Sequence, residues 1–128
     1  VLLKPGRVSA DEFAIIQTHT TIGARILSGS QVPLLQLAEE IARSHHERYD
    51  GDGYPDHLAG DDIPLAGRIV AVADAYDAMT HERPYRTALS PDDALAAIDA
   101  QRGRQFDPDV SQTFFRLLER RRRVRQSA

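Results

Sequence analysis

Three histidines are the residues of this sequence best suited to binding a metal ion. His45 and His46 are adjacent at the end of an expected helix, and His19 lies midway along an earlier one. Neutral imidazole is a ligand for iron, manganese, nickel and zinc. Consecutive helical residues point about 100° apart, so the adjacent pair can share one ion only where its helix frays. Any single histidine is more often structural or at the surface, but a pair directly before a glycine-rich loop raises the expectation of a metal site, with a structural role as the open alternative.

Asp74 would add a carboxylate to such a site. It lies in an expected helix over residues 64–80, whose middle, residues 69–73, is apolar on every side. A helix of that kind belongs in the centre of a bundle, where an uncompensated carboxylate is strongly destabilising. Two interpretations of this expected burial are open: a metal ligand, or a salt bridge to an arginine such as Arg68 or Arg43.

The long loop over residues 47–63 carries a second kind of candidate residue. Gly51 and Gly53 allow positive φ angles and a close approach of the backbone to a ligand, and Tyr54 stands between Gly53 and Pro55. Its main chain is constrained on both sides, which would hold the phenol in a fixed place. Loops of this length in a small domain are commonly functional, although Gly-Tyr-Pro by itself is an ordinary turn sequence.

Two arginines follow the third expected helix, in the segment Arg83-Pro84-Tyr85-Arg86. Proline stiffens the link between them, and guanidinium groups make forked hydrogen bonds with phosphate. The segment is therefore a candidate contact for an anionic substrate, with a solvated turn as the ordinary alternative. An arginine-rich stretch at residues 120–125 is interpreted as the solvated end of a helix, with an anionic partner or a basic linker as the alternative.

The elements that must position these residues are helices, because helical patterns follow one another and strand signals are nearly absent. Ser9 and Glu12 form a capping box, Pro33 suits the first turn of a helix, and Ser90 and Asp107 each precede a proline. We expect five helices with apolar residues at helical spacing, over residues 10–28, 33–46, 64–80, 91–101 and from 108 onward. The sequence thus predicts an all-α bundle, and we expect one or two further helices before Val1.

Length and composition are those of an ordinary globular domain. The chain has 128 residues, enough for one domain, with 41% hydrophobic and 27% charged residues. It has no cysteine, which excludes disulfides, zinc–thiolate sites and a cysteine nucleophile, and a cytoplasmic location is expected. The formal net charge of −3 gives no reason to expect nucleic acid as a partner. No apolar run approaches the ~20 residues of a membrane span.

The segment from His45 to Pro55, HHERYDGDGYP, resembles the HHExxDGxGYP signature that names the HD-GYP family. Further motifs of that family match in order along the chain: HTTIG from His19, ADAYDAMT ending at Thr80, RPYR from Arg83 and GRQFDP from Gly103. Ordered motifs over nearly the whole chain make the resemblance highly specific. Residues 1–128 are accordingly interpreted as the C-terminal part of an HD-GYP domain.

The resemblance implies a metal-dependent phosphodiesterase that hydrolyses cyclic di-GMP to linear pGpG, and in some members on to GMP. Matching positions imply metal ligands at His19, His45, His46 and Asp74, with His45, His46 and Asp74 as the catalytic candidates. Family members bind two or three divalent ions, usually iron or manganese, and hydroxide from the metal centre attacks phosphorus.

Substrate contacts and partners are implied in the same way. Tyr54 matches the signature tyrosine that lines the substrate pocket, and Arg83 and Arg86 match basic residues that contact the phosphates of cyclic di-GMP. The resemblance also implies a receiver or sensor domain on the N-terminal side, as in a two-component system, and a diguanylate cyclase as a protein partner.

The family's His-Asp pair is expected in a segment shortly before Val1, and this chain alone is therefore expected to be inactive or nearly so. A second hypothesis is a catalytically incomplete module that binds cyclic di-GMP or docks onto diguanylate cyclases. A third is an HD phosphohydrolase of other nucleotides, against which the Gly53–Pro55 loop argues. The four retained ligands and the intact Gly-Tyr-Pro favour the phosphodiesterase.

Overall fold

Five α-helices make up most of residues 9–127, the part of the chain whose backbone the computed structural model describes; side chains are described for residues 9–124. The helices are α1 (Ala10–Leu27), α2 (Pro33–Ser44), α3 (Leu65–Thr80), α4 (Pro91–Ala100) and α5 (Pro108–Ser127), with a short 3-10 turn, η1, at Gly60–Asp62. The predicted all-α fold is confirmed. Within these residues, every helix is too short or too polar to cross a membrane.

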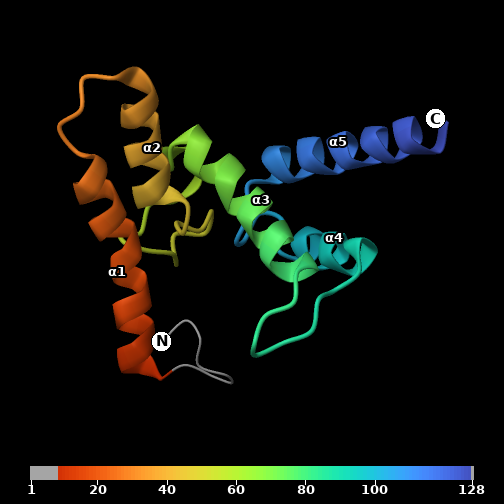
Figure 1. The fold of residues 1–128 in the computed structure, drawn as a ribbon, viewed down its shortest axis with the longest axis horizontal. Coiled ribbons are helices and arrows are strands. Elements are labelled where there is room, and N and C mark those ends of the chain that lie inside the picture. The colour runs from red at the N-terminus through yellow and green to blue at the C-terminus, as the bar shows by residue number, and fades with distance from the viewer. Residues whose placement is uncertain (1–8, 128) are drawn as a thin grey trace.

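The central element is α3. Figure 1 shows α1 and α2 side by side as a hairpin on one flank of α3, with α4 and α5 on the other flank. The contact between α2 and α3 is close because Gly67 is buried against Ser44, and a Cβ at Gly67 would collide with the serine side chain. This contact brings the end of α2, where the histidine pair lies, next to the central helix.

The helix starts follow from local side-chain chemistry. The Ser9 hydroxyl accepts a hydrogen bond from the Glu12 N–H at 3.1 Å, and the Ser90 hydroxyl accepts one from the Asp93 N–H at 3.1 Å. These bonds satisfy N–H groups that have no partner within the helix. Pro33 occupies the first turn of α2, as predicted. The starts of α1, α2 and α4 therefore agree with the sequence.

The apolar core sits between α3, α4 and α5. Val72, Ile98 and Phe106 are almost completely buried and pack together. Tyr76 of α3 and Phe114 of α5 close one side of this cluster, with their ring centroids 5.3 Å apart in an edge-to-face arrangement. The core thus lies on the α4–α5 flank of α3, away from the α1–α2 hairpin.

The prediction that α3 is buried on every side is wrong. Val72 is fully buried, but Leu65 is 55% exposed and Ile69 is 49% exposed, and Ala73 is also exposed. These three residues are spaced by four and so share one face of the helix. That face borders an open pocket between α3 and α5, whereas α3 makes its close contacts through its other faces.

Asp74 is exposed as well, so the expectation of a buried carboxylate is corrected. The salt bridge proposed as its alternative role is wrong too. Arg43 pairs with Asp56 through two hydrogen bonds of 2.8 Å, and Arg68 pairs with Asp107 at 2.8 Å. Both arginines therefore pair with carboxylates from loops and not with Asp74.

The pair of Arg68 and Asp107 ties α3 to the start of α5. The two side chains are 16% and 5% exposed, and the Arg68 guanidinium also donates to the Ile63 carbonyl at 2.9 Å. Asp107 accepts hydrogen bonds from the N–H groups of Asp109 and Val110, which caps α5. One buried carboxylate thus serves as the cap of a helix and as the partner of a buried cation.

Candidate metal centre

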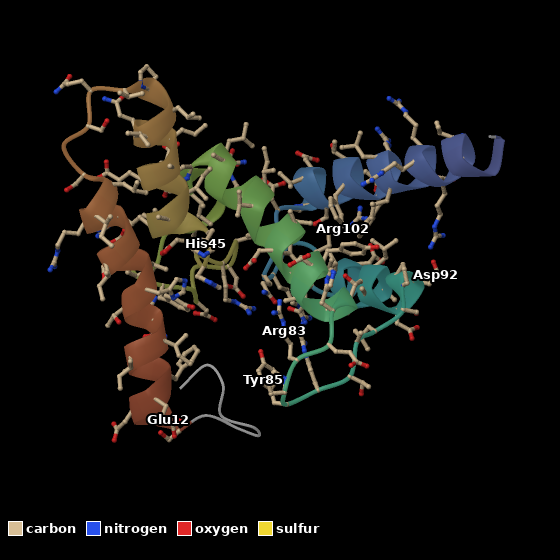
Figure 2. The ribbon with its side chains drawn as sticks, viewed as in Figure 1. Glu12, His45, Arg83, Tyr85, Asp92 and Arg102 are labelled. Carbon is tan, nitrogen blue, oxygen red and sulfur yellow. The ribbon has the colours of Figure 1, made fainter. Side chains whose placement is uncertain are left out.

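Three imidazoles meet where α1 passes the end of α2. His19 comes from the middle of α1, His45 is the C-cap of α2, and His46 follows it. One ring nitrogen from each lies within 4.8 Å of the other two, and Nε2 of His19 is 3.4 Å from Nε2 of His45. The adjacent pair can reach one point because it lies where the regular turn of α2 ends. Figure 2 labels His45 at this place.

Backbone carbonyls set the orientation of two of these rings. Nδ1 of His19 donates to the Ile16 carbonyl at 2.5 Å, and Nδ1 of His45 donates to the Ile41 carbonyl at 2.8 Å. A carbonyl oxygen can only accept, so each Nδ1 carries the proton, and the Nε2 of the neutral ring has a free lone pair. Two such lone pairs facing each other cannot form a hydrogen bond between themselves. They fit a shared cation, and the carbonyl partners are those that typically orient metal-binding histidines.

The third imidazole stays neutral at physiological pH. Burial, followed by the neighbouring His45 and His19, lowers the pKa of His46 from 6.5 to about 4, while Asp74 opposes the shift. Desolvation disfavours the charged form of a base. A neutral imidazole is the form that binds metal, so protons compete weakly for His46 above pH 5.

The metal-free protein is expected to lose stability on acidification because of His46. The unfolded chain protonates this residue near pH 6.5 and the folded chain only near pH 4, so the unfolded state binds more protons between these values. The stabilisation is fully present above pH 6.5 and is lost as the pH falls toward 4, in total roughly 2–3 kcal/mol. Urea unfolding at pH 7, 6, 5 and 4 measures it.

The matched comparison for that titration is His46→Gln, in which this proton-binding site is gone. The loss of unfolding free energy between pH 7 and pH 4 should be smaller in His46→Gln than in the unsubstituted protein. His57→Asn serves as the control, because His57 is exposed and asparagine tolerates its positive φ angle of 54°. Equal pH profiles for His46→Gln and the unsubstituted protein would contradict the prediction.

Asp74 stands apart from the three imidazoles. In the described part of the chain, the group of close potential ligand atoms consists of the three histidines alone. The negative charge of Asp74 nevertheless opposes the lowering of the His46 pKa and adds to the rise that burial causes in the Tyr54 pKa. The carboxylate is therefore close enough to act electrostatically on the site from α3, which is a separate helix from those that carry the imidazoles.

Tyr54 is the sequence-predicted residue that the structure places directly against the histidines. Its ring stacks on His46 with centroids 5.1 Å apart and an interplanar angle of 11°. It meets His19 edge to face at 6.4 Å, and Phe13 of α1 at 6.0 Å. Burial and then Asp74 raise the pKa of the phenol, so it remains a neutral hydrogen-bond donor. Phe13 is an apolar residue of α1, and helical spacing alone carries no signal for this contact.

The loop that carries Tyr54 is braced by the segment before α5. The Tyr49 N–H donates to the Gln105 carbonyl at 3.1 Å, and the Asp50 N–H donates to the Arg104 carbonyl at 2.8 Å. The Asp50 side chain in turn accepts a forked pair of hydrogen bonds from Arg48. The GRQFDP motif, for which the sequence suggested no role, thus supports the first part of the signature loop, residues 47–63.

The two candidate phosphate-binding arginines lie on the loop after α3, where Figure 2 labels Arg83 and Tyr85. The backbones of Arg83 and Arg86 hydrogen bond to each other across a tight turn, at 3.1 and 3.2 Å. The Arg86 guanidinium donates to the Ala78 carbonyl at 2.6 Å, near the C-terminal end of α3. Both arginines are exposed, and within the described residues neither hydrogen bonds to the histidine cluster.

Comparison with known proteins matches most of this chain to one family. The family model described as HD domain matches residues 1–110. The chain is 56% identical over 108 residues to the cyclic di-GMP phosphodiesterase response regulator RpfG of Xanthomonas campestris, which covers 84% of this chain and 29% of that protein. It is 49% identical over 117 residues to a cyclic di-GMP phosphodiesterase of Thermotoga maritima, covering 91% of this chain and 32% of that protein.

A second group of similar proteins is named for another cyclic dinucleotide. The chain is 46% identical over 110 residues to the 3'3'-cGAMP-specific phosphodiesterase 2 of Vibrio cholerae, covering 86% of this chain and 21% of that protein. The crystal structure of a cyclic GMP-AMP-specific phosphodiesterase of V. cholerae superposes with a TM-score of 0.66 at 29% identity, over 88% of this chain and 25% of that one. The chain thus spans less than a third of the length of these relatives.

Proposed function

The chain belongs to the HD domain family, as its motifs predicted, and on that premise we propose that it acts in the metal-dependent hydrolysis of a cyclic dinucleotide. The observation that carries the proposal is the convergence of His19, His45 and His46, with the facing Nε2 atoms of His19 and His45 3.4 Å apart. These nitrogens fit a divalent ion, for which we propose iron or manganese. In a complete domain, two or three ions are expected.

The residues of this chain would have distinct roles in such a reaction. The three imidazoles hold the metal, which when bound lowers the pKa of water and stabilises charge on phosphoryl oxygens. Asp74 acts on the same centre from α3, through its negative charge. Tyr54, whose phenol stays protonated, offers an O–H donor beside the cluster. Burial of its ring against His46 keeps that donor in one place.

We propose cyclic di-GMP as the substrate and linear pGpG as the first product. Support comes from the relatives of Xanthomonas and Thermotoga, which are named for cyclic di-GMP and are 56% and 49% identical to this chain. The Vibrio relative named for 3'3'-cGAMP makes that nucleotide the competitor to test beside it. In keeping with the name response regulator of the Xanthomonas relative, we also propose control by a receiver or sensor domain.

The test of this proposal separates binding from turnover. Residues 1–128 loaded with Mn²⁺ or Fe²⁺ are titrated with cyclic di-GMP, 3'3'-cGAMP and GTP by calorimetry, and product formation is followed by chromatography. We expect preferential binding of cyclic di-GMP and weak turnover, because three imidazoles define one ion site rather than two. Equal affinity for all three nucleotides would contradict the proposal. Binding without turnover, also in a longer chain that includes the segment before Val1, would favour a sensing or docking module instead.

Arg86→Ala is expected to weaken the binding of cyclic di-GMP by about ten- to a hundredfold, because a charge-assisted contact with phosphate is worth roughly 1.5–3 kcal/mol. The overall charge of −3 cannot attract two phosphodiesters, so local cations must. One guanidinium nitrogen of Arg86 donates a hydrogen bond to the Ala78 carbonyl. The remaining N–H donors of the guanidinium are those proposed to bind phosphate.

Arg121→Ala is the control for Arg86→Ala, since Arg121 is exposed on α5. Metal content and thermal unfolding are measured for both variants, because loss of the Ala78 contact also removes a bond at the end of α3. If Arg86→Ala binds cyclic di-GMP as the unsubstituted protein does, Arg86 only supports the turn, and the proposed substrate contact is wrong.

A further inference from the structure

Glu47 is a buried carboxylate beside the metal centre that does not take part in the histidine cluster. Only 3% of its surface is exposed. Its Oε1 accepts hydrogen bonds from the N–H groups of Asp56 and Leu58, both at 3.1 Å, and its Oε2 accepts one from Asp56 at 3.3 Å. In the described part of the chain, no cation forms an ion pair with it. The loop backbone is therefore its principal hydrogen-bonding partner.

These hydrogen bonds close the signature loop onto the end of α2. The Glu47 N–H donates to the Ser44 carbonyl at 3.0 Å, so the residue is itself anchored to the helix. Further along the loop, the Tyr54 N–H donates to the His46 carbonyl at 3.2 Å. The side chain of Glu47 binds the loop beyond Tyr54, because it accepts from the N–H groups two and four residues after this tyrosine.

Close packing makes this arrangement depend on few residues. Gly53 lies against the backbone of residues 46–48, and a Cβ there would be 2.5 Å from the His46 carbonyl oxygen. The loop is therefore pressed onto the chain that carries the histidines. The Tyr54 ring, next to Gly53, stacks on the imidazole of His46. Asp56 comes two residues after Tyr54, so the hydrogen bonds to Glu47 hold the segment that directly continues from this ring.

We propose that Glu47 is a positioning residue, which fixes Tyr54 against His46 by accepting the N–H groups of Asp56 and Leu58. The carboxylate is buried, so without these donors it would be left unsatisfied. The consequence for substrate binding rests on the proposed function, in which Tyr54 lines the pocket for a cyclic dinucleotide.

The variants Glu47→Ala and Glu47→Gln test the proposal, with Glu40→Ala as the matched control. Glu40 precedes Glu47 by two turns and is exposed on α2. NMR spectra of residues 1–128 supply two local measurements. These are the hydrogen exchange of the Asp56 and Leu58 amides, and the ring-proton shifts of Tyr54, which report its stacking on His46.

We expect faster exchange of both amides and a shift of the Tyr54 ring signals toward free-tyrosine values in Glu47→Ala. Glu47→Gln keeps one carbonyl acceptor and should restore part of both signals, while Glu40→Ala leaves them unchanged. Affinity for Mn²⁺ should change by less than about threefold in all three variants, because the Glu47 side chain bonds to backbone N–H groups and, among the described residues, orients no imidazole by a hydrogen bond. A purely structural role would alter unfolding without moving the Tyr54 signals.

A double-mutant cycle with Tyr54→Ala measures the effect on ligand binding. Glu47→Ala should weaken binding of cyclic di-GMP by about tenfold in the unsubstituted protein and by less than about twofold in a Tyr54→Ala background. Equal losses in the two backgrounds would overturn the proposal, as would unchanged Tyr54 ring shifts in Glu47→Ala.

The outcomes distinguish this inference from the proposed function. If the unsubstituted protein does not bind cyclic di-GMP, the proposed function fails, whereas the ring shifts and amide exchange still decide whether Glu47 positions Tyr54. If Glu47→Ala does not fold, the same two measurements on Glu47→Gln decide. In that case, amide exchange and Tyr54 ring shifts in Glu47→Gln that equal those of the unsubstituted protein and of Glu40→Ala would overturn the proposal.

Discussion

Replacing His46 by alanine is expected to weaken the binding of Mn²⁺ or Fe²⁺ by about a hundredfold or more. Loss of a residue that merely orients a metal ligand typically costs 10–100-fold in affinity, and a ligand itself should cost at least the upper value. His46 is the imidazole that burial and its neighbours keep neutral, with a pKa of about 4. It therefore offers its lone pair over the whole physiological range of pH.

The control for this experiment is His81→Ala. His81 is exposed and interacts with Asp77 outside the histidine cluster, so the variant should bind metal as the unsubstituted protein does. Calorimetric titration supplies affinity and stoichiometry, and elemental analysis of the purified protein supplies the metal that is bound. His19→Ala should resemble His46→Ala. Unchanged affinity and stoichiometry in both variants would show that the three imidazoles meet for a reason other than metal.

Asp107→Ala is expected to destabilise the fold by about 3–5 kcal/mol, since removing one partner of a buried ion pair leaves Arg68 with only the exposed Asp61 as a charged partner. Arg68 is 16% exposed and Asp107 is 5% exposed. The variant also loses the cap of α5, because Asp107 accepts the N–H groups of Asp109 and Val110. A loss of this size is a large share of the stability of an ordinary domain, so the variant is expected to be partly unfolded at 37 °C.

Asp61→Ala is the comparison for this variant because it removes another carboxylate from the same arginine. Asp61 is 3.4 Å from Arg68, and its side chain is 89% exposed. Exposed ion pairs typically contribute about 0–1 kcal/mol, so its replacement should change the urea midpoint only slightly. Similar midpoints for Asp61→Ala and Asp107→Ala would refute the view that burial, rather than the ion pair itself, makes Asp107 critical.

Asp107 also lies in the segment that links the core to the signature loop. Asp107 follows Phe106, which is almost fully buried, and the preceding carbonyls of Arg104 and Gln105 hold the backbone of residues 49–50. The site therefore depends on a segment more than fifty residues away in the chain. The motif from Gly103 to Pro108 was visible in the sequence, but its partner was not.

Local chemistry explains why most helix boundaries could be predicted. A cap joins residues three apart, as Ser9 and Glu12 do, and a proline in the first turn acts on its own backbone. Such interactions depend on neighbours that are adjacent in any conformation of the chain. The start of α3 at Leu65, with Pro64 as its N-cap, differs from the prediction by one residue, within the ambiguity of helix ends.

Burial could not be predicted in the same way. An apolar run such as residues 69–73 indicates that a helix prefers contact, but which of its faces finds a partner depends on how the other helices pack. In this protein the core lies toward α4 and α5, so Val72 is buried while Ile69 and Asp74 are exposed. The alternative of a salt bridge from Asp74 to Arg43 or Arg68 failed because these arginines pair with carboxylates on loops.

The sequence by itself determined the family, the helices and the residue types of the candidate site, because motifs and caps are encoded by residues close together in the chain. Only the tertiary structure decided that His19 meets His45 and His46 across two helices, that Tyr54 stacks on His46, and that Arg86 bonds to Ala78. These contacts join residues brought together by packing between helices and loops. Their geometry depends on the whole fold, which residue spacing alone does not specify.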